Sequence, residues 1–104
     1  MIVATTENIN NKPYEILGIV QGSTVQTKDM FTDIASSFKS LLGGEITGYT
    51  DMMNHAREEA FRRMIENAEG IYADAIIGFR YTTSAIMGGA SEILAYGTAI
   101  KFIE

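Results

Sequence analysis

One group of side chains in the sequence has the types and the spacing to bind a metal ion. His55 is followed three and four residues later by Glu58 and Glu59. In a helix these positions share a face, so an imidazole and a carboxylate there could act as two ligands. His55 and Glu59, with Glu58 beside them, are therefore candidate ligands for a divalent metal. A surface hydrogen bond or ion pair is the alternative interpretation of the same spacing.

The composition limits which metal and catalytic chemistry the chain can support. Cysteine is absent from the 104 residues, which excludes thiolate metal sites and disulfides. His55 is the only histidine, so a Ser-His-Asp arrangement would have to use it. Gly43-Gly44-Glu45 lacks the lysine and the spacing of a phosphate-binding loop, and a bend is the favoured interpretation. The cofactor stays open, with a divalent metal as the candidate, and the sequence favours a protein that is not an enzyme.

The charge balance argues against two classes of partner. Thirteen Asp and Glu residues outnumber eight Lys and Arg residues, for a net charge of −5. Nucleic-acid phosphates require a clustered basic surface, which this chain lacks. Residues 93–103 are too short to span a bilayer, and no basic, then apolar, signal-peptide pattern opens the chain. We expect one soluble cytoplasmic domain over residues 1–104, with no nucleic-acid or membrane partner.

The clearest element is a helix over residues 49–70, which would position His55 and Glu59. Its apolar residues recur every third or fourth position, which forms one broad stripe at helical period. Thr50 or Asp51 is expected to cap its start, and Gly70 to supply the left-handed residue at its end. A second, weaker helix is expected to begin at Asp29 and to stop at Gly43-Gly44. The apolar stripe requires a sheet to pack on.

The remaining segments predict that sheet. Residues 14–27, 73–86 and 91–103 are rich in β-prone residues, and Gly88-Gly89 predicts a hairpin turn between the last two. Residues 2–6 indicate a short edge strand. Gly18 and Gly22 lie on one face of the first long strand. They indicate either a bulge or a close approach by a helix, a neighbouring chain or a ligand.

Both faces of the predicted sheet carry apolar side chains. On the strand over residues 73–86, alternation places Ile77, Phe79 and Tyr81 on one face and Ile76 and Arg80 on the other. On the last strand, residues 93, 95, 97 and 99 face one way and residues 94, 96, 100 and 102 the other. One helix covers a single face, and an uncovered apolar face is typical of an interface. We therefore expect a homo-oligomer.

Motifs along nearly the whole chain resemble those of one family. They are Gly18-x-Val20-x-Gly22-x-x-Val25, Gly43-Gly44-Glu45, Tyr49, Ala56-Arg57-x-x-Ala60, Arg63-Met64, Ala73-Asp74-Ala75-Ile76-Ile77, Arg80, Glu92 and Ala95-Tyr96-Gly97-Thr98-Ala99. The sequence closely resembles the YbjQ-like family of small bacterial proteins, whose name refers to heavy-metal binding. The resemblance implies an α+β, dodecin-like β-α-β-β subunit, with a three-stranded antiparallel sheet covered by one long helix. It also implies a ring-shaped homopentamer in which extra short strands join neighbouring subunits.

A second group of candidate residues falls on these motif positions. Arg80 lies between Phe79 and Tyr81 in a predicted strand, where a buried charge requires a partner. That partner is either Glu92 on the adjoining strand, a neighbouring subunit, or an anionic ligand in a cleft between subunits. Arg57 and Tyr96 are further candidates for such a cleft, and Gly97 would let another backbone approach closely.

Three functions are consistent with these residues. The first is a binding or structural module that forms a homopentamer and is not an enzyme. The second is a heavy-metal-binding or metal-homeostasis protein that uses His55 and ring-repeated carboxylates. The third is a small-molecule binder or enzyme whose site forms between subunits around Arg57, Arg80, Glu92 and Tyr96.

Overall fold

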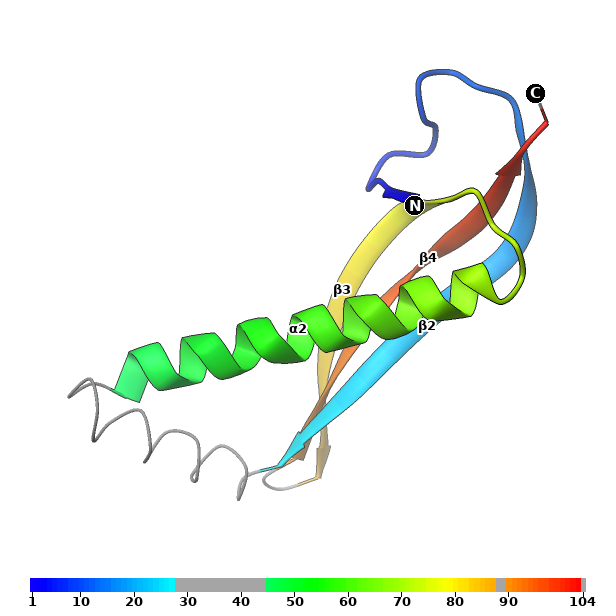
Figure 1. Cartoon of the computed structure of the whole chain (residues 1–104). Helices are drawn as coiled ribbons and strands as arrows, with labels where there is room; N and C mark the ends of the chain where they lie inside the picture. The colour runs from blue at the N-terminus through cyan, green and yellow to red at the C-terminus, as the bar shows by residue number, and fades with distance from the viewer. Residues whose placement is uncertain (28–44, 88–89, 104) are drawn as a thin grey trace.

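A computed structural model describes residues 1–27, 45–87 and 90–103 of the chain (Figure 1). The described elements are strands β1 (Ile2–Val3) and β2 (Tyr14–Thr27), helix α2 (Glu45–Glu69), and strands β3 (Ala75–Met87) and β4 (Ala90–Phe102). The helix lies across one face of the sheet (Figure 1). The predicted α+β class is confirmed. The helix expected after Asp29 and the turn expected at Gly88-Gly89 lie outside the described residues.

The sheet differs from the expected three-stranded antiparallel one. Among the described residues the sheet has four strands, in the order β1-β3-β4-β2. Strands β2 and β3 flank β4 in antiparallel pairs, whereas β1 runs parallel to β3, with Ile2 opposite Ala75. The sheet is therefore mixed. The two residues of β1 show too short a pattern to predict a pairing partner.

Helix α2 begins earlier than the sequence predicts. It starts at Glu45, so Thr50 and Asp51 lie inside the helix and do not cap it. The predicted start was placed after Gly48 because glycine has a low helix propensity. That prediction was wrong, since a single residue's propensity is a weak guide to a helix boundary.

The C-terminal end of α2 also differs from the prediction. Gly70 does not have a positive φ; the left-handed residue is Tyr72, with φ of 61°. The Ala73 amide donates to Ala68 O, and the Tyr72 amide donates to Glu69 O. This pair of bonds is the Schellman arrangement, with a tyrosine where glycine is most frequent.

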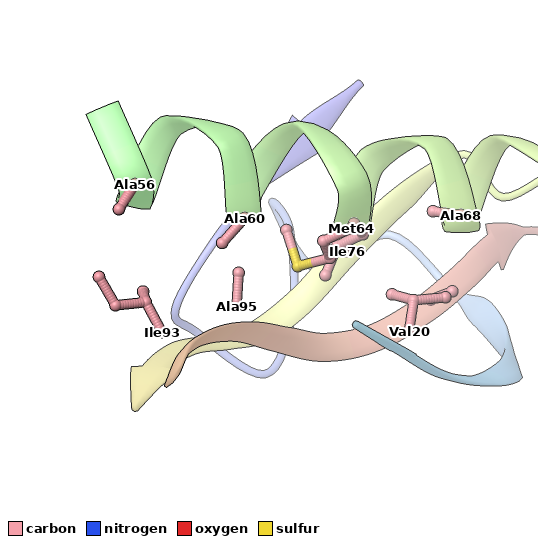
Figure 2. Close-up of a cluster of buried hydrophobic side chains, with 9 residues drawn as sticks. Val20, Ala56, Ala60, Met64, Ala68, Ile76, Ile93 and Ala95 are labelled. Atoms are coloured by element: carbon pink, nitrogen blue, oxygen red, sulfur yellow. The ribbon is translucent and has the colours of Figure 1, made fainter. Parts of the chain in front are cut away.

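One core lies between the helix and the sheet (Figure 2). The helix contributes the small residues Ala56, Ala60 and Ala68 together with Met64, all buried. The sheet opposes them with Val20, Ile76, Ile93, Ala95 and Ala99. Burial of these side chains is the main apolar contribution to stability. The predicted apolar stripe of the helix is confirmed.

A bulge in β3 overturns the predicted alternation of that strand. Gly78 has φ of 61°, and the register with β4 shifts between Ile77 and Arg80. Ile76 and Phe79 both pack against the helix-side core, whereas Ile77 belongs to a second cluster on the opposite face. The bulge adds one residue, so Phe79 and Tyr81 share a face with Ile76, not with Ile77.

The glycines of β2 and β4 have separate roles. A Cβ at Gly22 would lie within 3.0 Å of backbone atoms of Ala60, Arg63 and Met64, so the helix passes directly over this position. At Gly97 a Cβ would lie 2.6 Å from Ile76 Cγ2. Gly18 has open space around it and lies at a register shift between β2 and β4, as expected for a bulge. Of the two alternatives, Gly22 therefore shows the close approach of a helix and Gly18 the bulge, whereas Gly97 is crowded by Ile76 of its own sheet.

No helix among the described residues is long and apolar enough to cross a membrane.

We predict that Gly22→Ala lowers the free energy of unfolding by about 1–3 kcal/mol, because the added methyl group must push the helix backbone away. The measurement is urea denaturation of both proteins. Gly70→Ala is the matched control, since its Cβ would meet Asn67 O at an ordinary 3.5 Å. Equal effects of the two substitutions would contradict the close approach at Gly22.

Candidate functional site

The metal candidates lie on the exposed side of helix α2. His55 and Glu58 are exposed, and Glu59 is half-buried. Glu59 forms ion pairs with Arg62 and with Arg63, the latter at 3.2 Å. Within the described parts of the chain, no group of three or more His, Cys, Asp or Glu residues is placed to hold a metal ion.

Glu59 is held in its charged form by the two arginines. The hydrogen bond from Arg62 is the largest cause of the lowered pKa of Glu59. Desolvation opposes it, and the charges of Arg62 and Arg63 with the hydrogen bond from Arg63 lower the pKa further. A metal ion at Glu59 would therefore compete with two guanidinium groups for the same carboxylate.

Arg57 lies apart from the other cleft candidates. Its Nη1 donates to Asn54 Oδ1 at 2.9 Å within the helix. Its backbone oxygen accepts a hydrogen bond from Tyr81 Oη at 3.5 Å. Tyr81 lies on the helix side of β3, so Arg57 belongs to the helix side of the sheet.

Arg80, Glu92 and Tyr96 lie on the opposite face of the sheet. Arg80 is directly opposite Tyr96 in the β3–β4 pair, whereas Glu92 is opposite Ser84. Glu92 and Tyr96 are four positions apart along β4, a spacing of about 13 Å. The Arg80 side chain donates to Thr5 O at 3.2 Å and to Phe79 O at 2.8 Å. The expected salt bridge from Arg80 to Glu92 of the same chain is therefore not formed.

The sheet surface around Arg80 and Tyr96 is open to solvent and partly apolar. Val20, Gly22 and Thr24 of β2 face the helix, so the intervening residues of β2 face the other way. Ile19 is 79% exposed there and Val25 50% exposed. We call this surface the open face; it consists of Ile19, Gln21, Ser23 and Val25 of β2, Arg80, Thr82 and Ser84 of β3, and Glu92, Leu94, Tyr96 and Thr98 of β4.

The N-terminal loop covers the other end of the same face. Ile9 is buried against Ala75, Ile77 and Ile100, with Tyr14 and Phe102 packed around them. The Tyr14 hydroxyl donates to Glu7 O at 2.8 Å and holds the loop in place. The buried cluster under this loop ends at Ile77, the loop reaches Arg80 through the hydrogen bond to Thr5 O, and Ile16, at the boundary, is 67% exposed.

An aromatic row on the helix side was not anticipated from the sequence. Phe79 contacts Phe61 and Tyr81 edge to face, with ring centroids 5.5 Å and 4.8 Å apart. Burial raises the pKa of Tyr81. The spacing of Phe79 and Tyr81 is a signal of a shared face, but the contact with Phe61 depends on where the helix lies.

The sequence of this chain matches, over residues 1–103, a family model named YbjQ_1 and described as "Putative heavy-metal-binding". The chain belongs to the YbjQ family. The predicted resemblance is therefore confirmed over nearly the whole sequence.

The YbjQ family includes close relatives of this chain in several bacteria. A UPF0145 protein from Alkaliphilus metalliredigens is 55% identical over 103 residues, which cover 99% of this chain and 100% of the relative. A UPF0145 protein from Thermotoga maritima is 55% identical over 102 residues, 97% of this chain and 96% of the relative. One from Photobacterium profundum is 54% identical over 101 residues, with 97% and 98% covered. These names indicate no enzymatic activity.

A solved structure shares the fold of this YbjQ-family chain. It is the crystal structure of a protein with unknown function of the DUF74 family from Pediococcus pentosaceus. The two align with a TM-score of 0.67 over 98% of this chain and 97% of the other, at 20% sequence identity. At this identity the likeness shows the fold alone.

We predict that Glu59→Gln destabilises the protein at pH 7 and has little effect in acid. The folded-state pKa of Glu59 is lowered, so its contribution is present above the unfolded-state pKa and is lost as the pH falls through the folded value. The measurement is the urea midpoint of both proteins at pH 7 and at about pH 3. Glu69→Gln, an exposed site on the same helix, is the control, and an equal pH dependence there would contradict the role of the arginine pairs.

Proposed function

We propose that this chain is a self-assembling binding module, a dodecin-like subunit of a homopentameric ring that binds small anions at its subunit boundaries in the cytoplasm. One observation carries the proposal: the sheet face opposite helix α2 is open at one end and exposes Ile19 and Val25, 79% and 50% accessible. Isolated apolar side chains are common on surfaces, but here they share a face with Leu94 and Tyr96.

A second copy is the partner that we assign to the open face. The helix of each chain packs on its own sheet, and the N-terminal loop extends only as far as Arg80, whose side chain donates to Thr5 O. An identical neighbour rotated about an axis can cover one face with another in a closed ring. The number five comes from the family resemblance, and the open face supports assembly without setting its number.

The ligand is assigned from the charged and aromatic side chains of the open face. Arg80 is exposed beside Tyr96, and a guanidinium next to an aromatic ring suits a carboxylate or phosphate on a small molecule. Glu92, about 13 Å from Tyr96 along β4, would mark the far limit of the same site. Arg57 lies on the other side of its own sheet, so it would contribute to this site only from a neighbouring copy.

Metal binding is the second candidate function, favoured by the description of the family model. His55 and Glu59 are one helical turn apart and could supply two ligands. Further ligands would have to come from other copies, and Glu59 would have to leave Arg62 and Arg63. We rank this function second because of that competition.

We predict that Ile19→Lys dissociates the ring, because a charge placed in an apolar interface must be desolvated. Native mass spectrometry should show a mass of about five chains, or a multiple of five where rings associate, for the unchanged protein, and species smaller than one ring for the variant. Ile71→Lys is the control, at an isoleucine that is 43% exposed in the turn after the helix. A monomeric unchanged protein at micromolar concentration would contradict the assembly.

We predict that small dicarboxylates or sugar phosphates raise the melting temperature, and that Arg80→Ala abolishes this shift while His55→Ala preserves it. The measurement is a thermal-shift screen of the three proteins against anionic metabolites and divalent metal salts. A shift by metal ions alone, lost in His55→Ala and kept in Arg80→Ala, would instead establish the metal-binding function.

A further inference from the structure

Strand β3 has a backbone edge that the described part of the chain leaves uncovered. At its beginning this edge is occupied: the Phe79 amide donates to Ala4 O at 3.1 Å, and the Ala4 amide donates to Ile76 O at 2.9 Å. Because outward-pointing amides alternate along a strand, those of Tyr81, Thr83 and Ala85 point to the same side as that of Phe79. Every residue from Arg80 to Ala85 is exposed.

The opposite edge of the sheet, formed by β2, is covered in its middle by side chains of the helix. The Gln21 amide donates to Asn67 Oδ1 at 3.3 Å, and Arg63 Nη1 donates to Ser23 O at 2.6 Å. Side chains of helix α2 therefore satisfy the outward backbone groups in the middle of β2. An added strand would have to displace both contacts, so β2 is protected against edge pairing.

The residues along the free β3 edge favour hydrogen bonding to an added strand. The segment from Arg80 to Ala85 has the sequence RYTTSA, without proline or lysine. Tyrosine and threonine favour strands, whereas lysine, proline and bulges are the usual protections of an exposed edge. The register of β3 with β4 shifts at two places, between Ile77 and Arg80 before the free segment and between Ala85 and Met87 at its end, so the pairing from Arg80 to Ala85 is itself regular.

We propose that the β3 edges of two copies of this chain pair with each other, antiparallel, about a two-fold axis at Thr83. This register places Thr83 opposite its own copy and Tyr81 opposite Ala85, so all three outward positions are used, for about six backbone hydrogen bonds. A register centred on Thr82 would pair only two of them, because Phe79 is already bonded to Ala4.

The side chains of this register are complementary. Thr83 against Thr83 is a favourable cross-strand pair, and Thr82 would face Ser84 on the other side of the sheet. The Tyr81 ring, held edge to face against Phe79, would lie over the small Ala85 side chain of the other copy. A bulky residue therefore meets a small one at both ends of the pairing.

The choice of a second β3 as the occupant follows from the other edges. The outer edge of β2 is engaged by the helix at Gln21 and Ser23 and is irregular at Gly18, and β1 has two residues, so we assign another β3, whose free edge has the same length, as the partner. A two-fold contact uses the same patch twice and closes at two copies. It is independent of the open face, and it would join two rings into a particle of about ten chains.

Cysteine cross-linking tests the register directly, because the natural chain has no cysteine. Thr83→Cys should give a covalent dimer when oxidised with diamide, since directly opposite Cα atoms lie about 5.5 Å apart, within disulfide range. Thr82→Cys is the matched control: its own copy lies two residues out of register, beyond that range. Dimer from Thr83→Cys and little from Thr82→Cys is expected; equal yields, or none from either variant, would overturn the proposal.

Native mass spectrometry of Thr83→Lys separates this pairing from the ring. Two like charges would face each other at the axis, so the particle mass should halve, from about ten chains to five, or from two to one if no ring forms. Thr50→Lys, an exposed threonine on the helix, should leave the mass unchanged. A five-chain particle that neither substitution alters would overturn the edge pairing and leave the ring intact.

Discussion

The short distance between helix α2 and strand β2 is the constraint on which the rest of this structure depends. It is possible only because Gly22 has no side chain under the helix backbone and because the helix presents alanines at Ala56, Ala60 and Ala68. Packing at this distance also lets Thr24 Oγ1 donate to Ala56 O at 3.3 Å. The helix is thereby placed over β2 and β4, where Asn67 and Arg63 reach the edge of β2.

The position of the helix decides which surfaces remain for function. A helix over β2 and β4 leaves the outer half of β3 exposed and cannot reach the opposite face of the sheet. The N-terminal loop covers that face only around Ile9, so Arg80 and Tyr96 remain at a solvent-exposed boundary. The surfaces assigned to partners and ligands are thus what one helix and one loop leave uncovered.

The sequence predicted the parts of the fold that depend on local pattern. The apolar stripe of the helix, the three long strands and the faces of β4 follow from residue periodicity, and the family follows from the motifs. The pairing of β1 could not be predicted, because two residues carry no register information. Neither could the bulge at Gly78 or the left-handed Tyr72, since both depend on backbone angles that the packed chain imposes.

The sequence named the residues of the candidate site but could not predict which of them lie close together. Arg57 and Arg80 lie on different sides of the sheet, and Glu92 is too far along β4 to pair with Arg80. The distance between Arg80 and Glu92 follows only from the register of β3 with β4.

The bulge at Gly78 has a consequence for how this sequence can change length. Because the bulge contributes one residue beyond the regular pleat, it reverses the two sides of β3 from Phe79 to Ala85, where the next register shift begins. Loss of a single residue there would turn Phe79 and Tyr81 out of the helix-side core and bring Arg80 into it. Gains or losses of one residue in this strand are therefore tolerated only in compensating pairs, whereas the loop around Asn10 and Asn11 can vary in length without exchanging inside for outside.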